Sequence, residues 1–483
     1  MNDSANNKVS AIAAIIHKEW REVVRDGRFR FASVATVLLL LLAMTFGWQQ
    51  AERIHHEREA AGDVARKHWD HQGEKNPHMA THYGMYVFKP TGSLSYLDPG
   101  VEPYLGVSVK IEGHRQNLPT HAAASDSTAI HQFGGLTVAT GLQWLVPLLI
   151  IGLAFGSWTS ERERGTLRQL ASSGLALPVL AVGKTGGLLA VLAALLIPTA
   201  ALGGGVVSAL GHFGAVDVGR IVAFMAAYGV YFLVFVAVTL AISATASASR
   251  VALVLALGFW VTTAVVAPRV LADVVGAIKP LPTAYELAHA VAESLDKGLP
   301  GQTPKEERVE EFSKELLEQH GFLGAEMMMP EALLQGLELQ AEARFENEVF
   351  DYHFGALNAD IGAQEVWAQW LSFFSPTLAV RSLSMAFAGT DHAHHRDFFA
   401  HAEQYRRELV QLMDNDFATN AGADGWDYVA GPELWAKAPR FEYEPPGLFW
   451  VLGHQWKSVL ALMCWLVGAG VTSWVFARRM RVI

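Results

Sequence analysis

The sequence TSERERGTLRQLASSGLALPVLAVGK, residues Thr159–Lys184, is a polar stretch between two long apolar segments. Phe133–Trp158 before it and Thr185–Leu210 after it contain no charged residue. Each segment is long enough to cross a bilayer, because a spanning helix needs about 20 apolar residues. The stretch is therefore predicted to be the connection between two membrane spans.

The connection itself is predicted to form one short helix. Ser160 and Glu163 have the spacing of a capping box at its start, and Gly174–Pro178 predicts its end. Arg164 and Arg168 are four residues apart, so a continuous helix would place them on one exposed face. Arginine and lysine between spans indicate the cytoplasmic side of the membrane and, taken alone, nothing more.

Composition divides the rest of the chain into membrane and non-membrane parts. Of its 483 residues, 51% are hydrophobic and 17% are charged, and the charged residues are clustered. This pattern is typical of a multi-span membrane protein. The net charge is −10, and residues 273–446 alone hold 12 Lys and Arg against 30 Asp and Glu. A nucleic-acid partner is not expected for so acidic a region.

Six spans are predicted from the apolar runs. The first five are expected at residues 31–48, 133–158, 185–210, 221–249 and 251–268. The sixth is expected within residues 447–477, which begin with an interfacial entry and continue as the span Ser458–Ala477. Residues 1–30 precede the first span and are predicted to form an amphipathic helix on the membrane surface. Six basic residues lie in that helix region, and three arginines lie in the tail 478–483. Both termini are therefore expected in the cytoplasm.

Two segments are predicted to lie outside the membrane, on the side opposite the termini. Residues 49–132 favour helix in their first half and strands with turns over Tyr83–Gln116. Residues 273–446 are dominated by helical patterns, for example at Lys305–His320 and Glu331–Tyr352. The predicted fold is a mainly α membrane protein with six transmembrane helices, a mixed first outside loop and a large helical second outside domain.

Three sequence segments resemble a known family. Glu161–Leu167, ERERGTL, resembles the E-R-E-x-G-T-L segment after the second span of ABC-2 type transporter permeases. LSFFSPTLAVRSLSMAFAGT and its continuation to Ala418, together with MYVFKP and LDPGVEPYLGVSV, resemble the DUF3526 subgroup of those permeases. That subgroup has a large helical domain before its last span, so the resemblance extends over nearly the whole chain and implies the ABC-2 permease architecture.

The resemblance implies a function and a set of partners. It implies the non-catalytic membrane subunit of an ATP-driven transporter in a bacterial inner membrane, more often an exporter than an importer. A separate cytoplasmic ATPase would bind ATP and magnesium, a second permease would complete the dimer within the lipid, and a periplasmic partner could bind outside. The residues implied in coupling to the ATPase are Glu161, Arg162, Glu163, Arg164, Gly165, Thr166, Leu167 and Arg168.

No catalytic, cofactor-binding or metal site is predicted in this chain itself. The sequence of Pro178–Thr185 is similar to the motif of a phosphate-binding loop, but it has proline at the position where the motif requires its first glycine. Histidines gather at His392–His395, near Asp391 and His401, and again at His55–His56. Adjacent histidines on a helix face different directions, so these clusters lack the spacing of a closed metal site. Met327–Met329 is interpreted as apolar packing.

Two other functions remain open from the sequence. One is a membrane-anchored sensory or scaffold protein whose acidic outside domain binds a partner without transport. The other is a permease in copper-enzyme maturation, an idea that depends on a related permease branch and on the histidines. The substrate, the direction of transport and the choice between homodimer and heterodimer are not specified by the residues.

Overall fold

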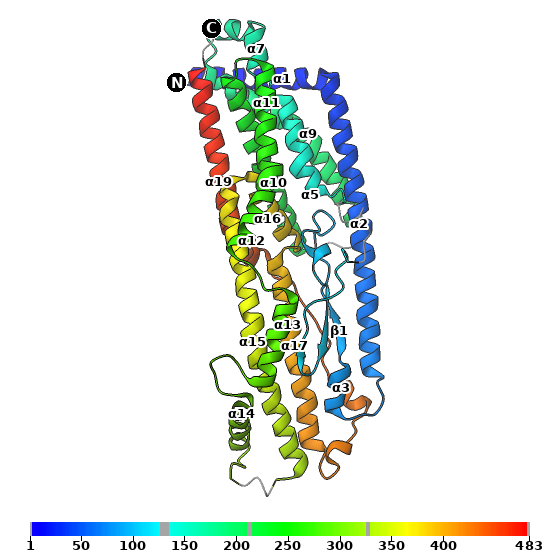
Figure 1. The fold of residues 1–483 in the computed structure, drawn as a ribbon. Coiled ribbons are helices and arrows are strands. Elements are labelled where there is room, and N and C mark those ends of the chain that lie inside the picture. The colour runs from blue at the N-terminus through cyan, green and yellow to red at the C-terminus, as the bar shows by residue number, and fades with distance from the viewer. Residues whose placement is uncertain (1, 126–134, 210–214, 325–328, 481–483) are drawn as a thin grey trace.

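The computed structural model describes residues 2–125, 135–209, 215–324 and 329–480. Within these residues, six helices are long and apolar enough to cross a membrane, which confirms the predicted number of spans. They cover Phe29–Asp70, Val138–Glu163, Leu177–Leu202, Val218–Thr245, Ser249–Ile278 and Leu448–Arg479. The two termini lie at the same end of the elongated molecule (Figure 1).

Most of the length of the spanning helices is made of ten helical elements of the described residues. These are α2 (Gly27–Asp70), α5 (Val138–Thr140), the π-helix η2 (Gly141–Leu145), α6 (Val146–Ala154), α9 (Leu177–Ala209), α10 (Ala215–Thr245), α11 (Ser249–Trp260) with the π-helix η3 (Val261–Val266) and α12 (Ala267–Ile278), and α19 (Leu448–Arg479). A π-turn adds one residue to a helical turn, so it shifts the face that the rest of the helix presents. The second and fifth spans each contain one such turn.

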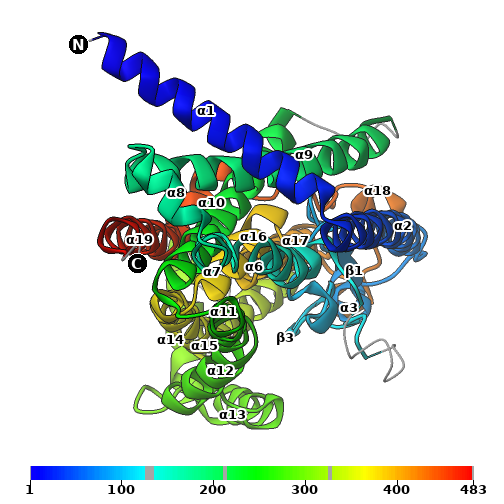
Figure 2. The same cartoon turned by 90° about the horizontal axis from the view of Figure 1, so that it is seen from above.

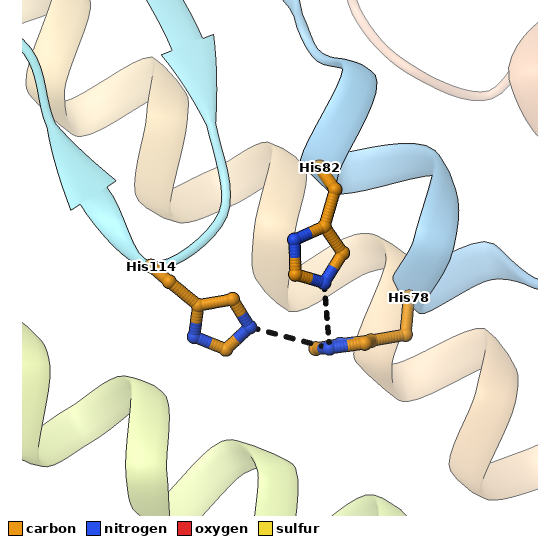
Figure 3. A group of neighbouring side chains, drawn as sticks. All are labelled: His78, His82 and His114. Carbon is orange, nitrogen blue, oxygen red and sulfur yellow. Dashed lines mark hydrogen bonds between the residues drawn. The ribbon is translucent and has the colours of Figure 1, made fainter.

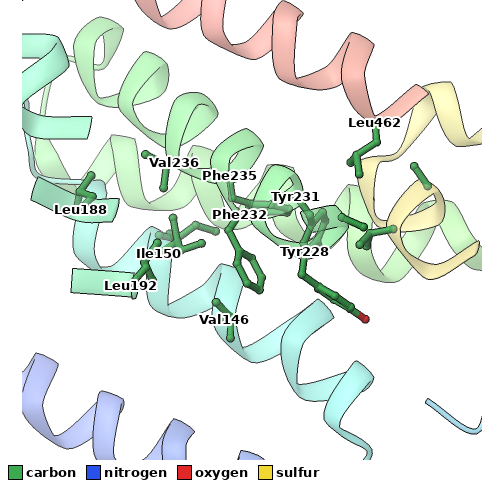
Figure 4. Close-up of a cluster of buried hydrophobic side chains, with 14 of the residues drawn as sticks. Val146, Ile150, Leu188, Leu192, Tyr228, Tyr231, Phe232, Phe235, Val236 and Leu462 are labelled. Carbon is green, nitrogen blue, oxygen red and sulfur yellow. The ribbon is translucent and has the colours of Figure 1, made fainter. Parts of the chain in front are cut away.

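Helix α10 lies at the centre of the bundle, where it contacts α6, α9, α11 and α19. Its aromatic face, with Tyr228, Tyr231, Phe232 and Phe235, packs against aliphatic side chains of the neighbouring helices (Figure 4). Tyr231 and Phe235 are fully buried. Buried phenol groups need hydrogen-bond partners, and the Tyr231 hydroxyl donates to the Gln143 carbonyl at 2.9 Å.

The amphipathic helix predicted at the amino terminus is α1 (Asn2–Arg25), which lies across the ends of the spanning helices (Figures 1 and 2). The helix ends at Arg25, within the predicted range 1–30, and α2 starts at Gly27. Glycines of α9 allow close packing on α1: a Cβ atom at Gly187 would lie 2.5 Å from the Cβ of Glu19. This contact brings the charged residues of α1 onto α9.

The segment 49–132, called the first outside segment after its predicted location, combines helix and sheet in its described residues, as predicted. Helix α2 continues past the apolar run to Asp70, and α3 (Pro77–Tyr83) follows. The sheet has the order β1-β2-β3, with antiparallel strands β1 (Met85–Phe88), β2 (Ser108–Glu112) and β3 (Arg115–Gln116), and the 3-10 helix η1 (Glu102–Tyr104) lies between β1 and β2. Met85 pairs with Ile111, and Glu112 pairs with Arg115 across a two-residue turn.

The second outside segment is helical, as predicted: α14 agrees with its predicted range to within one residue, whereas α15 continues past Tyr352 to Leu371. The elements are α13 (Ala284–Lys297), α14 (Lys305–Gln319), α15 (Glu331–Leu371), η5 (Ser372–Phe374), α16 (Pro376–Ala388), α17 (His392–Asn420), η6 (Gly425–Asp427) and α18 (Pro432–Trp435). Helix α17 packs on α3 and β2, so the two outside segments form a joint structure.

Helix α16 packs within the bundle core, which its sequence did not indicate. It contacts α10 and α19, and Val380 and Leu383 are buried in the same cluster as Tyr228. The Tyr228 hydroxyl donates to Ser384 Oγ at 3.0 Å, and Ser384 Oγ donates to Asp98 at 2.5 Å. With 13 residues α16 is too short to span a bilayer, so the helix extends into the bundle without crossing it.

Candidate functional site: the connection between the second and third spans

The connection forms two short helices where one was predicted. These are α7 (Thr159–Glu163) and α8 (Thr166–Ser172). Gly165 separates them with φ at +71°, in the left-handed region that favours glycine. The predicted capping box is wrong: Trp158, not Ser160, stands at the N-cap of α7 and provides no side-chain cap, and Glu163 accepts from Ser249 of another helix. The connection's helical part ends at Ser172, just before Gly174 as predicted, and Pro178 lies in the first turn of α9.

Glu161 forms a buried ionic cluster that connects three helices. Its Oε1 lies 2.6 Å from Lys18 Nζ on α1 and 2.9 Å from Lys184 Nζ on α9. Lys184 Nζ also lies 2.9 Å from Glu19 Oε1 on α1. The cluster holds two positive and two negative side chains, and the Lys184 side chain is only 2% exposed. Charges buried this deeply need such partners, since desolvation of an unpaired charge is costly.

The ion pairs of Lys18 change the pKa of its side chain. Burial alone would lower the pKa of Lys18, but the hydrogen bond to Glu161 and the surrounding carboxylates outweigh it and raise that pKa. Lys18 therefore stays charged, as the two carboxylates of the cluster require. Lys184 forms ion pairs with the same two carboxylates. This is the lysine of the segment Pro178–Thr185, which is similar to a phosphate-binding loop.

Arg162 and Glu163 fix α7 to the turn between α10 and α11. The Arg162 guanidinium donates to the carbonyl oxygens of Ala244 and Ala246, both at 2.8 Å. Glu163 accepts from the backbone N–H of Ser249 at 2.7 Å and from its hydroxyl at 2.9 Å. A cation at the carboxyl end of one helix and an anion at the amino end of the next both complement the helix dipoles. Helix α7 is therefore fastened at both sides.

The remaining residues of the connection divide between core and solvent. Leu167 is 1% exposed and belongs to the bundle core, whereas Arg164 and Arg168 are exposed. Among the residues that the structure describes, neither of these guanidinium groups forms an ion pair or a side-chain hydrogen bond. The predicted shared helical face of the two arginines is wrong, because Gly165 interrupts the helix between them.

The histidines considered from the sequence lie elsewhere and do not converge. His394 is buried, with Nδ1 2.5 Å from Asp391 Oδ1 and Nε2 3.3 Å from Arg220 Nη2. Burial, followed by the charge of Lys89 and by His392, lowers the pKa of His395 to about 3. Met327 and Met328 lie outside the described residues.

A different histidine group does converge, and sequence reasoning missed it. His78, His82 and His114 place one ring nitrogen each within 4.8 Å of one another, the single such group of three among the described residues. His78 and His82 are four residues apart on α3, a spacing that shares one helix face. That spacing was the available signal, while the approach of His114 depends on the tertiary fold.

Comparison with protein families supports part of the predicted resemblance. A family model described as Domain of unknown function (DUF3526) matches residues 284–444, from α13 to the segment after α18. No curated protein matches the chain. The predicted resemblance to DUF3526 is thus confirmed over about a third of the sequence, and the ABC-2 assignment remains a prediction.

Proposed function

We propose that this protein is the membrane-spanning subunit of an ABC-2 type transporter, coupled to a separate cytoplasmic ATPase. The proposal places the protein in a bacterial inner membrane, with both termini and the connection α7–α8 in the cytoplasm. It includes a second permease, identical or related, as the dimer partner. ATP and magnesium would bind to the ATPase, so this chain would have no enzymatic role of its own.

One observation carries the proposal: the residues of Glu161–Arg168 divide into a fastened set and a free set. Glu161, Arg162 and Glu163 are held by other helices of the chain, and Leu167 is buried. Among the charged residues of this segment, only Arg164 and Arg168 form no ion pair and no side-chain hydrogen bond with the described residues. A rigid connection with two available guanidinium groups suits a contact with an acidic or polar groove on another protein.

The fastened set supports a mechanical role for the connection. A push on α7 reaches α1 and α9 through the Glu161 cluster, and it reaches α10 and α11 through Arg162 and Glu163. Because these contacts are buried or bidentate, displacement of α7 displaces the four helices with it. Closure of the ATPase subunits would change the arrangement of the spans by this route, and so the access to a path between the two permeases.

The experiment that tests the proposal is affinity purification of the full chain from its native membrane in mild detergent. We expect an ABC-type ATPase and a second permease subunit to copurify, with ATP hydrolysis that depends on this chain. A sensory or scaffold protein would instead retain partners of its outside segments and no ATPase. Absence of any ATPase, under conditions that preserve the second permease, would contradict the proposal.

A further inference from the structure

Three imidazole rings meet where the two outside segments pack together (Figure 3). His78 Nε2 lies 3.3 Å from His82 Nε2 and 3.2 Å from His114 Nε2. His78 and His82 come from α3, and His114 comes from the turn between β2 and β3. The three nitrogens therefore face a common point, although His114 is more than thirty residues from the other two.

Local structure holds the histidines in these positions. Asn76 caps α3 by accepting hydrogen bonds from the N–H groups of His78 and Met79, and Pro77 occupies the first turn. His114 has φ at +60°, in the left-handed region. A non-glycine residue in this region is strained and persists only where the surroundings enforce the conformation. The turn is thus held in a conformation that presents the His114 ring to α3.

Two carboxylates hold the outer nitrogens of two rings. His78 Nδ1 lies 3.2 Å from Asp414 Oδ1 on α17, and His114 Nδ1 lies 2.8 Å from Glu346 Oε1 on α15. An ionised carboxylate only accepts hydrogen bonds, so each Nδ1 must carry the proton. In the neutral tautomers of both rings, the Nε2 atoms then present lone pairs to each other at 3.2 Å. Two lone pairs at this distance repel unless a cation lies between them.

The geometry decides which kind of cation fits. A proton joins two nitrogens, whereas here the ring nitrogens of three histidines converge within 4.8 Å. Zinc binds histidine nitrogen at about 2.0–2.1 Å, and tetrahedral angles then separate two ligand nitrogens by about 3.3 Å. The observed separations of 3.2 and 3.3 Å match that value. Carboxylates on the far side of ligand histidines are the usual support of such a centre.

We propose that His78, His82 and His114 form a zinc site with three Nε2 ligands and a fourth position open to solvent. Asp414 and Glu346 fix two of the rings and together balance the charge of a divalent ion. His82 is exposed, so the ion can enter from that side, while His78 is 7% exposed and lies beside the Trp426 ring.

The site joins parts of the chain that are distant in sequence. Its ligands belong to the first outside segment, and the carboxylates that orient them belong to α15 and α17 of the second. Bound zinc would therefore strengthen the contact between the two outside segments. This role does not depend on an ATPase partner, so the inference stands or fails independently of the proposed transporter function.

The test is zinc binding to the purified full chain in detergent, stripped with a chelator and titrated with ZnCl₂. We expect one zinc per chain by elemental analysis, and Co²⁺ in its place should give the visible absorption of a tetrahedral centre. His82→Gln and His114→Gln should each abolish stoichiometric binding. Asp414→Asn should weaken the affinity about 10–100-fold and keep the stoichiometry, since it alters only the support of a ligand.

A matched control and a folding check complete the test. The double variant His55→Gln with His56→Gln removes two exposed histidines and should bind zinc like the parent protein. Circular dichroism and elution volume identify any variant that fails to fold; His82→Gln, which alters the exposed ring, then decides. Zinc binding unchanged in folded His82→Gln, or no zinc in the parent protein, would overturn the proposal.

Discussion

The connection α7–α8 and the histidine cluster lie in opposite halves of the elongated molecule (Figure 1), and their polar groups are paired in different ways. In the connection, Lys18, Glu19, Glu161 and Lys184 neutralise one another within the chain. In the cluster, three ring nitrogens converge without an opposite charge at the point where they meet. The first arrangement balances its charges within this chain, whereas the second is the one for which we propose an added cation.

The comparison teaches where to look for partners in a membrane protein of this kind. A charged motif is informative only after the charges used for internal pairing are subtracted from it. In ERERGTLR the subtraction leaves Arg164 and Arg168. In the outside segments, His78, His82 and His114 still direct one ring nitrogen each toward one another after two of the rings are paired with carboxylates. The following variants disturb the internal pairing or test its limits.

The largest effect is expected for Lys184→Met. Removing this lysine leaves Glu19 and Glu161 with Lys18 as their remaining partner in a buried site. Loss of one member of a buried pair typically costs about 3–5 kcal/mol, because the other charge stays desolvated. Unfolding in mixed micelles of increasing denaturing detergent should show this loss. Arg168→Met removes the same charge from an exposed position and should stay within about 0.5 kcal/mol of the parent protein.

A smaller loss is expected for Arg162→Met, which leaves the carbonyl oxygens of Ala244 and Ala246 without their donor. Unsatisfied buried acceptors cost about 1–3 kcal/mol. The same unfolding assay should detect it, and hydrogen exchange should accelerate in the turn before α11. Arg162→Lys keeps the charge but lacks the planar fork, so it should restore only part of the loss. Stability of Arg162→Met equal to that of the parent would show that the turn holds itself.

The pH dependence of stability tests the partly buried His395 of α17. His395 has a pKa lowered to about 3 by burial, then by Lys89 and His392. The unfolded chain binds this proton near pH 6.5, so the free energy of unfolding falls as the pH drops below 6.5. Between pH 7 and 5 the loss amounts to at most about 2 kcal/mol. Thermal unfolding of His395→Asn should show a smaller acid sensitivity.

The His395 comparison needs the difference between variant and parent. Burial raises the pKa of Glu365 to about 7, against the effect of Arg396, so this group opposes the trend of His395 over part of the range. Its contribution is common to both proteins and cancels in the difference. Equal acid sensitivity of the two proteins would show that His395 is protonated in the folded state.

The smallest effect is expected for Gly165→Ala. A Cβ atom at Gly165 would meet nothing within 4 Å, so the cost comes from the left-handed backbone alone. That cost is about 1 kcal/mol, and asparagine tolerates the conformation better than alanine. Gly165→Asn should therefore be the milder variant in the same unfolding assay. Equal stability of alanine and glycine would show that the break between α7 and α8 is not enforced.

Much of the fold follows from sequence periodicity, and the exceptions have identifiable causes. Apolar runs predict the six spans, and the pattern of Tyr83–Gln116 predicts strands where the structure has β1, β2 and β3. The position of α16 was not predicted, because a 13-residue helix with Arg381 resembles a surface helix. Its serine and threonine side chains find partners such as Tyr228 and Tyr231 only in the assembled bundle.

The sequence predicted which segment forms the site, but it did not predict the contacts that this segment makes in the structure. The sequence placed Glu161–Arg168 between two spans and gave no indication that Glu161 meets Lys18 and Lys184. Those contacts join residues more than twenty positions apart, and local patterns do not encode them. The same holds for the histidines: the spacing of His78 and His82 is visible in the sequence, whereas the approach of His114 requires the packed sheet.

The central claim is that Arg164 and Arg168 are left free for an ATPase while the rest of the connection is held within the chain. The most direct measurement is ATPase copurification and coupled hydrolysis for Arg164→Glu with Arg168→Glu, after correct membrane insertion is established. Charges paired at a buried interface contribute about 2–5 kcal/mol, so the account predicts lost binding or uncoupled hydrolysis, with lysine at both positions milder. Parental copurification and coupling in the correctly inserted double-glutamate variant would contradict it.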